Sequence, residues 1–379
     1  RGLDNDNWLA SEELFLALFP NNTYGSQTTI GTIDHLKNPS LTEIKKYYDK
    51  YYVPNNMAIC LSGDFDPDAT IKLIDEKFGI WKQKPVPPYQ PYIEKPITQP
   101  VIKEVLGPQA ENVNIAYRFG GANTNDADMI YMIDQVLANG KAGLIDLNLN
   151  QQQKVLSANS YVEGLKDYTV HIMDGEPKAG QSLEQVKGLL LEQIENIKKG
   201  NFPDWLLGAI LNNAKLQQTK RYEANAARAD AFVAAFSNQM SWQTYTTRFD
   251  RLSKITKQQI IDFVKKNYTN NYAVVYKRIG ENKNVQKVVK PEITPVQVNR
   301  GEKSDFVKTV LSKPVSDIQP VFLDYNKDIK KFNLKNGVQV LYTPNIENKT
   351  FGMYYIFDMG TNQDKKLGMA INYLKYLGT

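Results

Sequence analysis

The residues that most often carry enzyme chemistry are scarce in this chain. It has 379 residues, and its only histidines are His35 and His171. They lie far apart, and neither has a glutamate at the spacing that would place two imidazoles and a carboxylate on one helix face. Two isolated histidines also give no basis for a Ser-His-Asp arrangement. We interpret His35 as a loop or helix-start residue and His171 as a partly buried structural residue of a strand.

One cysteine and one acidic run complete the candidate reactive groups. Cys60 lies inside an apolar stretch with no histidine near it in sequence, which favours a small buried hydrophobic residue over a nucleophile. The run Asp64-Phe-Asp66-Pro-Asp68 imitates the start of a calcium loop, but Ala69 stands where that loop needs glycine. We interpret the run as a strand end followed by helix caps. We therefore nominate no catalytic, cofactor-binding or metal-binding residue.

A repeated pattern indicates which elements organise the chain. The stretch Ser40–Asp64 returns at Thr256–Gly280, and each copy is typical of a capped helix, an Asn-rich turn and a strand. Tyr52 aligns with Tyr268 when one gap is allowed. The copies lie roughly 215 residues apart, which is far longer than a solenoid period and indicates duplication of a domain.

The duplication predicts an α+β fold of tandem related domains, each an antiparallel-type sheet packed with helices. Because the stretch that ends in the first copy is about half as long as its partner, we expect the first domain to be truncated at its N-terminus. The expected parts are the C-terminal part of a first domain at 1–84, a Pro-rich linker at 85–100, a second domain at 101–280, a long hinge at 281–330 and the beginning of a third domain at 331–379.

Several local predictions follow the apolar spacing. A helix at Thr42–Tyr52 is expected to bury Leu41, Ile44, Tyr48 and Tyr51. Met57–Leu61 is apolar on both faces, which predicts a strand covered on both sides. A single long helix is predicted from Asp204 to about Phe236, and an apolar strand at Phe351–Phe357.

Composition excludes some classes of function. The net charge is +5 with both signs interspersed, and no basic stripe of the kind that binds nucleic acid is present. No run of 18 apolar residues exists, so we predict no membrane span.

One set of short motifs resembles the pitrilysin/insulinase family of zinc metallopeptidases. In their order and spacing the motifs are Leu18-Phe19-Pro20 with Tyr24-Gly25, Ile30-Gly31, Tyr51-Tyr52-Val53-Pro54-Asn55-Asn56-Met57, Gly63-Asp64 and Phe78-Gly79-Ile80-Trp81. The resemblance covers most of the chain and implies the fold of that family. Larger members pair two halves through a hinge, and 281–330 is similar in position to that hinge.

The resemblance implies zinc held by His-x-x-Glu-His on a helix and by a glutamate from a later helix. The chain has no such motif, so we expect these ligands upstream of Arg1. Glu12 and Glu13 lie too late in the pattern and are interpreted as surface charges. The family's Gly-x-Ala-His-x-x-Glu-His corresponds to Gly368–Lys375, where Ile371, Leu374 and Lys375 replace His, Glu and His. That replacement is similar to the inactive second half of larger members.

The resemblance thus implies a fragment of a zinc metalloendopeptidase that hydrolyses peptides or small proteins in a closing chamber. Zn²⁺ is expected in the parent protein and not in this fragment, which is predicted to be inactive alone. The implied partners are a peptide substrate, held partly as an added strand, and the remaining halves of the same polypeptide. The periplasm or cell envelope of a bacterium is the expected location. The alternative is a non-catalytic structural or peptide-holding homologue.

Overall fold

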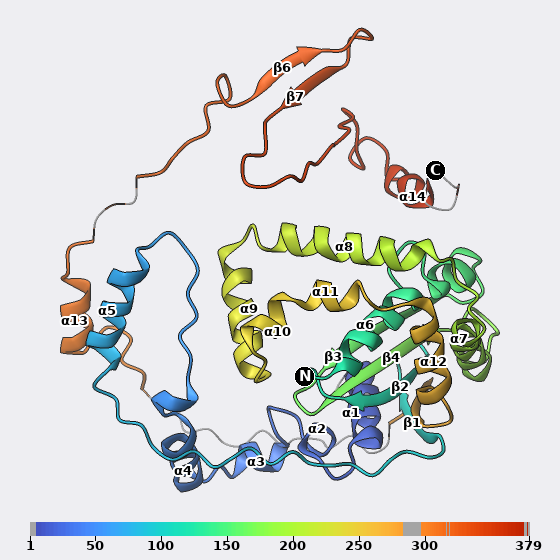
Figure 1. Cartoon of the computed structure of the whole chain (residues 1–379), viewed down its shortest axis with the longest axis horizontal. Helices are drawn as coiled ribbons and strands as arrows, with labels where there is room; N and C mark the ends of the chain where they lie inside the picture. The colour runs from blue at the N-terminus through green and yellow to red at the C-terminus, as the bar shows by residue number, and fades with distance from the viewer. Residues whose placement is uncertain (1–4, 283–296, 316, 318, 375–376, 378–379) are drawn as a thin grey trace. The chain divides into compact units, whose positions relative to one another are not determined.

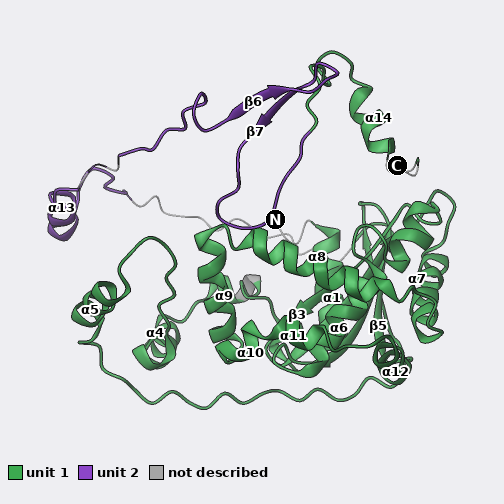
Figure 2. Cartoon of the chain, turned by 45° about the horizontal axis from the view of Figure 1, so that its top comes forward, with its two compact units in different colours: residues 1–283, 355–379 green, residues 284–354 purple. Residues whose placement is uncertain are grey.

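The computed structural model describes residues 5–282, 297–315, 317, 319–374 and 377 (Figure 1). The chain divides into two compact units, Arg1–Lys283 with Tyr355–Thr379, and Asn284–Tyr354 (Figure 2). Among the helices within the described residues, none has the length and hydrophobicity that a bilayer-spanning segment needs.

One five-stranded sheet organises the first unit. Its order is β1-β5-β2-β4-β3, in which only the β1–β5 pair is parallel. The sheet with its helices confirms the predicted α+β class. The strands are β1 (Val101–Gly107), β2 (Asn112–Gly120), β3 (Ser157–Gly164), β4 (Tyr168–Glu176) and β5 (Tyr272–Ile279).

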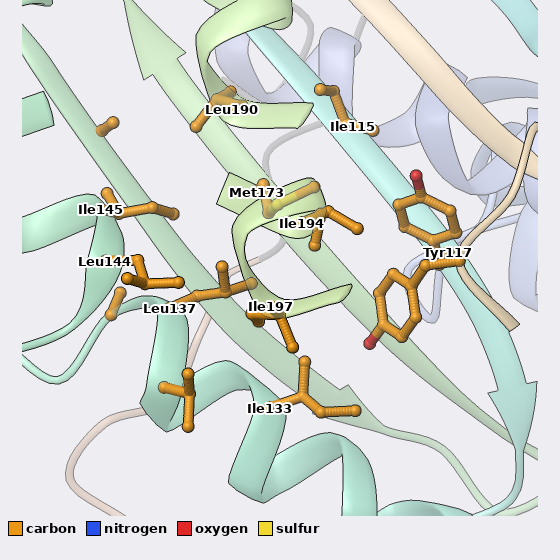
Figure 3. Close-up of a cluster of buried hydrophobic side chains, with 14 of the residues drawn as sticks. Ile115, Tyr117, Ile133, Leu137, Leu144, Ile145, Met173, Leu190, Ile194 and Ile197 are labelled. Carbon is orange, nitrogen blue, oxygen red and sulfur yellow. The ribbon is translucent and has the colours of Figure 1, made fainter. Parts of the chain in front are cut away.

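A layer of helices buries one face of this sheet. Apolar residues at helical spacing on α6 and α7 point toward alternate residues of β2, β4 and β5, which gives one contiguous core. Figure 3 shows Ile133 and Leu137 of α6 gathered with Ile194 and Ile197 of α7 around Met173 of β4. The helices of this region are α6 (Asn125–Leu137), α7 (Leu183–Lys198), α8 (Trp205–Arg221), α9 (Asn225–Ser237), α10 (Trp242–Thr246), α11 (Arg248–Leu252) and α12 (Lys257–Asn267), and a π-helical turn, η3, spans Asp146–Gln151.

A helix from the start of the chain, α1 (Asp6–Leu18), covers the other face. Its buried Leu14 and Leu18 pack in one cluster with Ala273 and Val275 of β5. The first residue of α1 also makes a buried ion pair, because Asp6 Oδ2 lies 3.1 Å from the Nζ of the fully buried Lys277. Removing either partner would leave an unpaired charge in the interior, so this contact ties α1 firmly to the sheet.

The Pro-rich segment runs extended beside the sheet. Within residues 82–98, all of which are described, the backbone forms no helix or strand. The Tyr168 hydroxyl donates to the Tyr92 carbonyl at 2.9 Å and accepts from the Glu94 N–H at 2.8 Å. These bonds fasten the segment to the start of β4.

The two copies of the repeated pattern form matching helices. α4 (Leu41–Tyr51) and α12 each have 11 residues. The N-cap hydroxyls of Ser40 and Thr256 each accept a backbone N–H from three residues later, as the cap spacing predicts. A 3₁₀ turn, η2 (Pro54–Asn56), follows α4.

The predictions for burial in the first copy are wrong. Met57–Leu61 forms no strand and is partly to well exposed, and Cys60 is half-buried rather than enclosed. Leu41, Ile44 and Tyr48 of α4 are exposed as well. The reason is that no other described strand pairs with this segment, and an extended segment needs a neighbour to form a sheet that covers a helix.

Two further predictions need correction. The helix expected from Asp204 to about Phe236 is broken between α8 and α9, where Ala224 has an extended backbone and Arg228 Nε donates to the Tyr222 carbonyl at 2.5 Å. No glycine or proline lies at this break, so the residue types there did not indicate a helix end. Residues Phe351–Phe357 are described but form no strand, in contrast to the prediction. No described strand pairs with them, and their large apolar side chains are exposed.

The remaining elements include a β-hairpin near the C-terminal end of the chain. β6 (Lys330–Asn333) and β7 (Gln339–Tyr342) pair antiparallel, and Gly337 in the turn has φ 87°, which glycine adopts without strain. The other helices are α2 (Thr23–Ser26), α3 (Ile33–Lys37), α5 (Pro67–Phe78), α13 (Asp305–Leu311) and α14 (Leu367–Tyr373).

Candidate functional site

The two histidines occupy opposite environments. His35 is exposed on α3, where its Nδ1 accepts the Thr32 N–H at 3.3 Å. His171 on β4 has no exposed surface, so it is fully rather than partly buried. The two therefore make no common site.

His171 belongs to a buried hydrogen-bond network that sequence reasoning missed. Ser160 Oγ lies 2.7 Å from His171 Nε2 and 2.7 Å from Asp134 Oδ1, while the Tyr268 hydroxyl lies 2.6 Å from His171 Nδ1. The hairpin register pairs Val162 with His171, which places Ser160 on the same face two residues along the neighbouring strand. That pairing was the available signal, but Asp134 and Tyr268 come from distant elements.

This network is built for structure rather than nucleophilic catalysis. In a catalytic triad the carboxylate holds the histidine nitrogen opposite the serine, whereas here Ser160 lies between Asp134 and His171. Burial raises the pKa of Tyr268, so its phenol keeps its proton. One arrangement satisfies every group: Tyr268 donates to His171 Nδ1, His171 Nε2–H donates to Ser160, and Ser160 donates to Asp134. A substrate has no access to this buried chain.

The residues present do not fit a zinc site. His171 Nε2 and Asp134 Oδ1 are 3.4 Å apart, and both are already engaged by Ser160. In the described ranges, no group of three or more His, Cys, Asp or Glu side chains is placed to hold a metal. Zn²⁺ needs at least three such ligands in a catalytic site.

The positions that correspond to the family motif are equally unsuited to zinc. Ile371 lies on α14 and Leu374 directly follows it, and both carry hydrocarbon side chains. Lys375 lies outside the described residues. Glu12 and Glu13 are partly exposed on α1, and Glu13 Oε2 lies 3.9 Å from Lys103 Nζ.

An edge of the sheet provides unpaired backbone groups instead. Among the strands of the described residues, β3 is an outer strand whose one partner is β4. The Leu165 N–H bonds to the Tyr168 carbonyl at 2.8 Å and closes the hairpin. Because bonding alternates along an antiparallel pair, Ser160, Val162 and Gly164 direct their N–H and C=O groups away from β4. These three residues form what we call the open edge.

A side chain marks where the open edge ends. The Ala158 N–H donates to Asn150 Oδ1 at 2.9 Å, and Asn150 Nδ2 donates to the Ala158 carbonyl at 2.8 Å. Asn150 of η3 thus occupies both outward groups of Ala158 as a neighbouring strand would. The β3–β4 turn limits the other end, so the open edge extends from Ser160 to Gly164.

Acidic and aromatic side chains flank the open edge on the face that carries α1. Tyr161 and Glu163 of β3 share this face with Asp174 of β4. Burial, with the charges of Asp174 and Glu163, raises the pKa of Tyr161 to about 12. Burial also raises the pKa of the Glu163 carboxyl, and burial together with Glu176 raises that of Asp174. Carboxyl groups of β3 and β4 thus lie beside Tyr161 on the face of the sheet that carries α1.

Comparison with known proteins places this fold. The model of a family described as Peptidase M16 inactive domain matches residues 39–214. The zinc protease PqqE of Helicobacter pylori is 24% identical over 213 residues, which are 54% of this chain and 48% of that protein. A little under half of the chain therefore matches a domain of the M16 (pitrilysin/insulinase) peptidase family. The chain spans about half the length of the curated relative it matches.

Solved M16-like structures share the fold. A protease from Helicobacter pylori superposes with a TM-score of 0.66 at 19% identity, over 73% of this chain and 67% of that one. The periplasmic protease PqqL of Escherichia coli superposes with a TM-score of 0.59 at 14% identity, over 91% of this chain and 41% of that one. At such identities the likeness establishes architecture, and the matched M16 segment is of the inactive-domain type.

Proposed function

We propose that this chain is part of an M16-type zinc metalloendopeptidase and contributes a peptide-holding surface rather than metal ligands. The observation that carries the proposal is the open edge of β3, where Ser160, Val162 and Gly164 present backbone groups that no other strand of the described residues pairs with. Since the residues present do not fit zinc, the metal would be held by residues outside this sequence. The relative from Helicobacter pylori, named a zinc protease, supports the activity of the parent.

Strand addition explains how such an edge holds a substrate. An extended peptide aligned with β3 places its own N–H and C=O groups opposite those of the open edge. Each bond contributes about 0.5–1.5 kcal/mol net, so a few bonds retain a peptide without preventing its release. The backbone contacts suit many sequences, as a protease acting on varied peptides requires.

The surrounding protein would supply what this chain lacks. The chain spans about half of its curated relative, and Met57–Leu61, which follows η2, has no pairing strand among the described residues. We propose that the parent pairs this segment with a strand of its first domain and encloses the peptide between two halves. A periplasmic or cell-envelope location in a bacterium agrees with the relative PqqL, a periplasmic protease.

A second candidate is a non-catalytic, peptide-holding member of the same fold. The match to an inactive-type domain and the misfit of Ile371 and Leu374 to zinc favour it. An intact His-x-x-Glu-His motif in the parent gene would favour the peptidase, and a degraded motif would favour the holding protein.

The test combines metal analysis, peptide cleavage and peptide binding on the purified chain. We expect zinc well below one equivalent, no cleavage of a mixed peptide library, and measurable binding of extended peptides. A peptide N-methylated at alternate backbone nitrogens removes the donors that strand addition needs and is expected to lose binding. Stoichiometric zinc in this chain, or equal binding of both peptides, would overturn the proposal.

A further inference from the structure

The open edge lies beside carboxylates that have no counter-charge. Glu163 follows Val162 on β3, and Asp174 pairs with Asn159 across the β3–β4 ladder. Glu176 lies two residues further along the same face of β4. Within the part of the chain that the structure describes, no lysine or arginine forms an ion pair with these three carboxylates. Glu163 lies on the edge strand itself, whereas Asp174 and Glu176 lie on β4, one strand further from an added peptide.

The environment makes these carboxylates receptive to a cation. Glu163 and Asp174 have lost part of their water, and Asp174 also faces the like charge of Glu176. A half-desolvated carboxylate without a partner is costly, and an incoming positive charge removes that cost. Tyr161, 43% exposed between them, offers an aromatic ring that attracts cations over its face.

Strand addition would place alternate side chains of the bound peptide beside Tyr161 and Glu163. Side chains of an added strand alternate between the two faces, so every second one lies beside Tyr161 and Glu163. Directly opposed side chains have Cβ atoms about 4.5–5.5 Å apart, within reach of a lysine or arginine head group. The intervening residues lie on the face of Val162, which packs against the apolar core.

We infer that the open edge selects extended peptides that place lysine or arginine on the Tyr161–Glu163 face and apolar residues on the Val162 face. This rests on the proposed peptide-holding function and adds the class of peptide. Asn150 and the hairpin turn confine the pairing to Ser160–Gly164, so two basic side chains at alternate positions saturate the site.

The experiment compares two peptides of the same length that differ in the sign of their side-chain charge. Fluorescence anisotropy on the purified chain would use labelled heptapeptides that alternate valine with lysine or valine with glutamate, blocked at both termini so that side chains supply all charge. We expect the lysine peptide to bind about tenfold more tightly at low ionic strength, and the difference to shrink in high salt.

Variants locate the selectivity. Glu163→Gln is expected to weaken lysine-peptide binding about threefold, and Asp174→Asn, which lies one strand further away, by less. The double variant should weaken it more than either change alone, while binding of the glutamate peptide improves. The matched control is Glu192→Gln, which removes one exposed charge from α7 in the helix layer of the opposite face and is expected to change nothing.

The outcomes separate the two proposals. Equal binding of the lysine and glutamate peptides, or no effect of the double variant, would overturn the charge selectivity and leave strand addition standing. Failure of both peptides to bind, or equal binding of their N-methylated forms, would overturn the peptide-holding function itself. Circular dichroism of each variant checks that a loss of binding is not a loss of fold.

Discussion

The two copies of the helix–turn–strand pattern have the same local structure and opposite burial. α4 and α12 match in length and in N-cap geometry. Ile44 is 55% exposed whereas its counterpart Ile260 is fully buried. Tyr52 is 58% exposed whereas Tyr268 is 1% exposed. Local sequence is therefore sufficient for the helix and its caps, while the neighbouring sheet decides what the helix buries.

The strand after each helix explains the difference. β5 lies between β1 and β2, so the residues after α12 enter the middle of a sheet. Met57–Leu61 is similarly apolar but has no described strand beside it. A likeness persists even so. Ser62 aligns with Lys277, and each contacts the first residue of a helix. The Ser62 hydroxyl donates at 3.3 Å to the side chain of Asn225, the first residue of α9, and Lys277 pairs with Asp6, the first residue of α1.

The largest expected contrast is at the matched tyrosines. Tyr268 packs with ring centroids 4.6 Å from Tyr117 and 5.0 Å from Phe119, and bonds to His171. Tyr268→Ala is expected to lower the free energy of unfolding by about 4 kcal/mol, because it leaves a cavity and an unpaired imidazole. Urea unfolding measures it, and Tyr52→Ala is the matched control, with a change below about 0.5 kcal/mol. Equal losses would show that the copies are equally buried.

The next contrast is between a charged and an uncharged contact at equivalent positions. Asp6→Ala leaves Lys277 buried without a counter-charge and is expected to cost about 3 kcal/mol. Adding Lys277→Met removes the unpaired charge and should restore part of that loss; the rest remains because the carbonyls that Lys277 contacts lose their donor. Asn225→Ala at the exposed counterpart is expected to cost less than about 0.5 kcal/mol. A double variant no more stable than Asp6→Ala would contradict this reading of the pair.

A smaller and equal effect is expected at the caps. Ser40→Ala and Thr256→Ala each remove one hydroxyl that accepts a backbone N–H in the first helical turn. Each is expected to destabilise its own helix by about 1 kcal/mol. Hydrogen exchange at the first turn of α4 and of α12 measures this, and a clear inequality would mean that burial also controls the helix ends.

The smallest expected effect is the pH dependence that the Asp174 carboxyl adds to the stability of the folded chain. Burial raises the pKa of Asp174 in the folded chain, so the unfolded chain releases this proton first. The stability that protonated Asp174 lends is present at acid pH and is lost as pH rises through the raised folded pKa. The melting temperature would be measured at about pH 4 and about pH 7. Over this rise in pH, the parent chain is expected to lose more thermal stability, or to gain less, than Asp174→Asn. An equal change of the melting temperature in both proteins would show that Asp174 does not contribute to this pH dependence.

Sequence reasoning succeeded where local rules decide. The helices capped by Ser40, Asp66 and Thr256 begin as predicted because a cap depends on residues three apart. It failed for Met57–Leu61, where apolar character predicted burial that only a paired strand provides. The network of Ser160 with His171 and the closure of Ala158 by Asn150 were also missed. Both join residues that only the folded sheet brings together.

The most direct test of the account is peptide binding before and after exhaustive chelation of the purified chain. If this chain holds peptides through the open edge of β3 and not through zinc, affinity for an extended lysine-valine peptide should be unchanged by the chelator. Loss of binding on chelation, with recovery on adding zinc, would contradict the account.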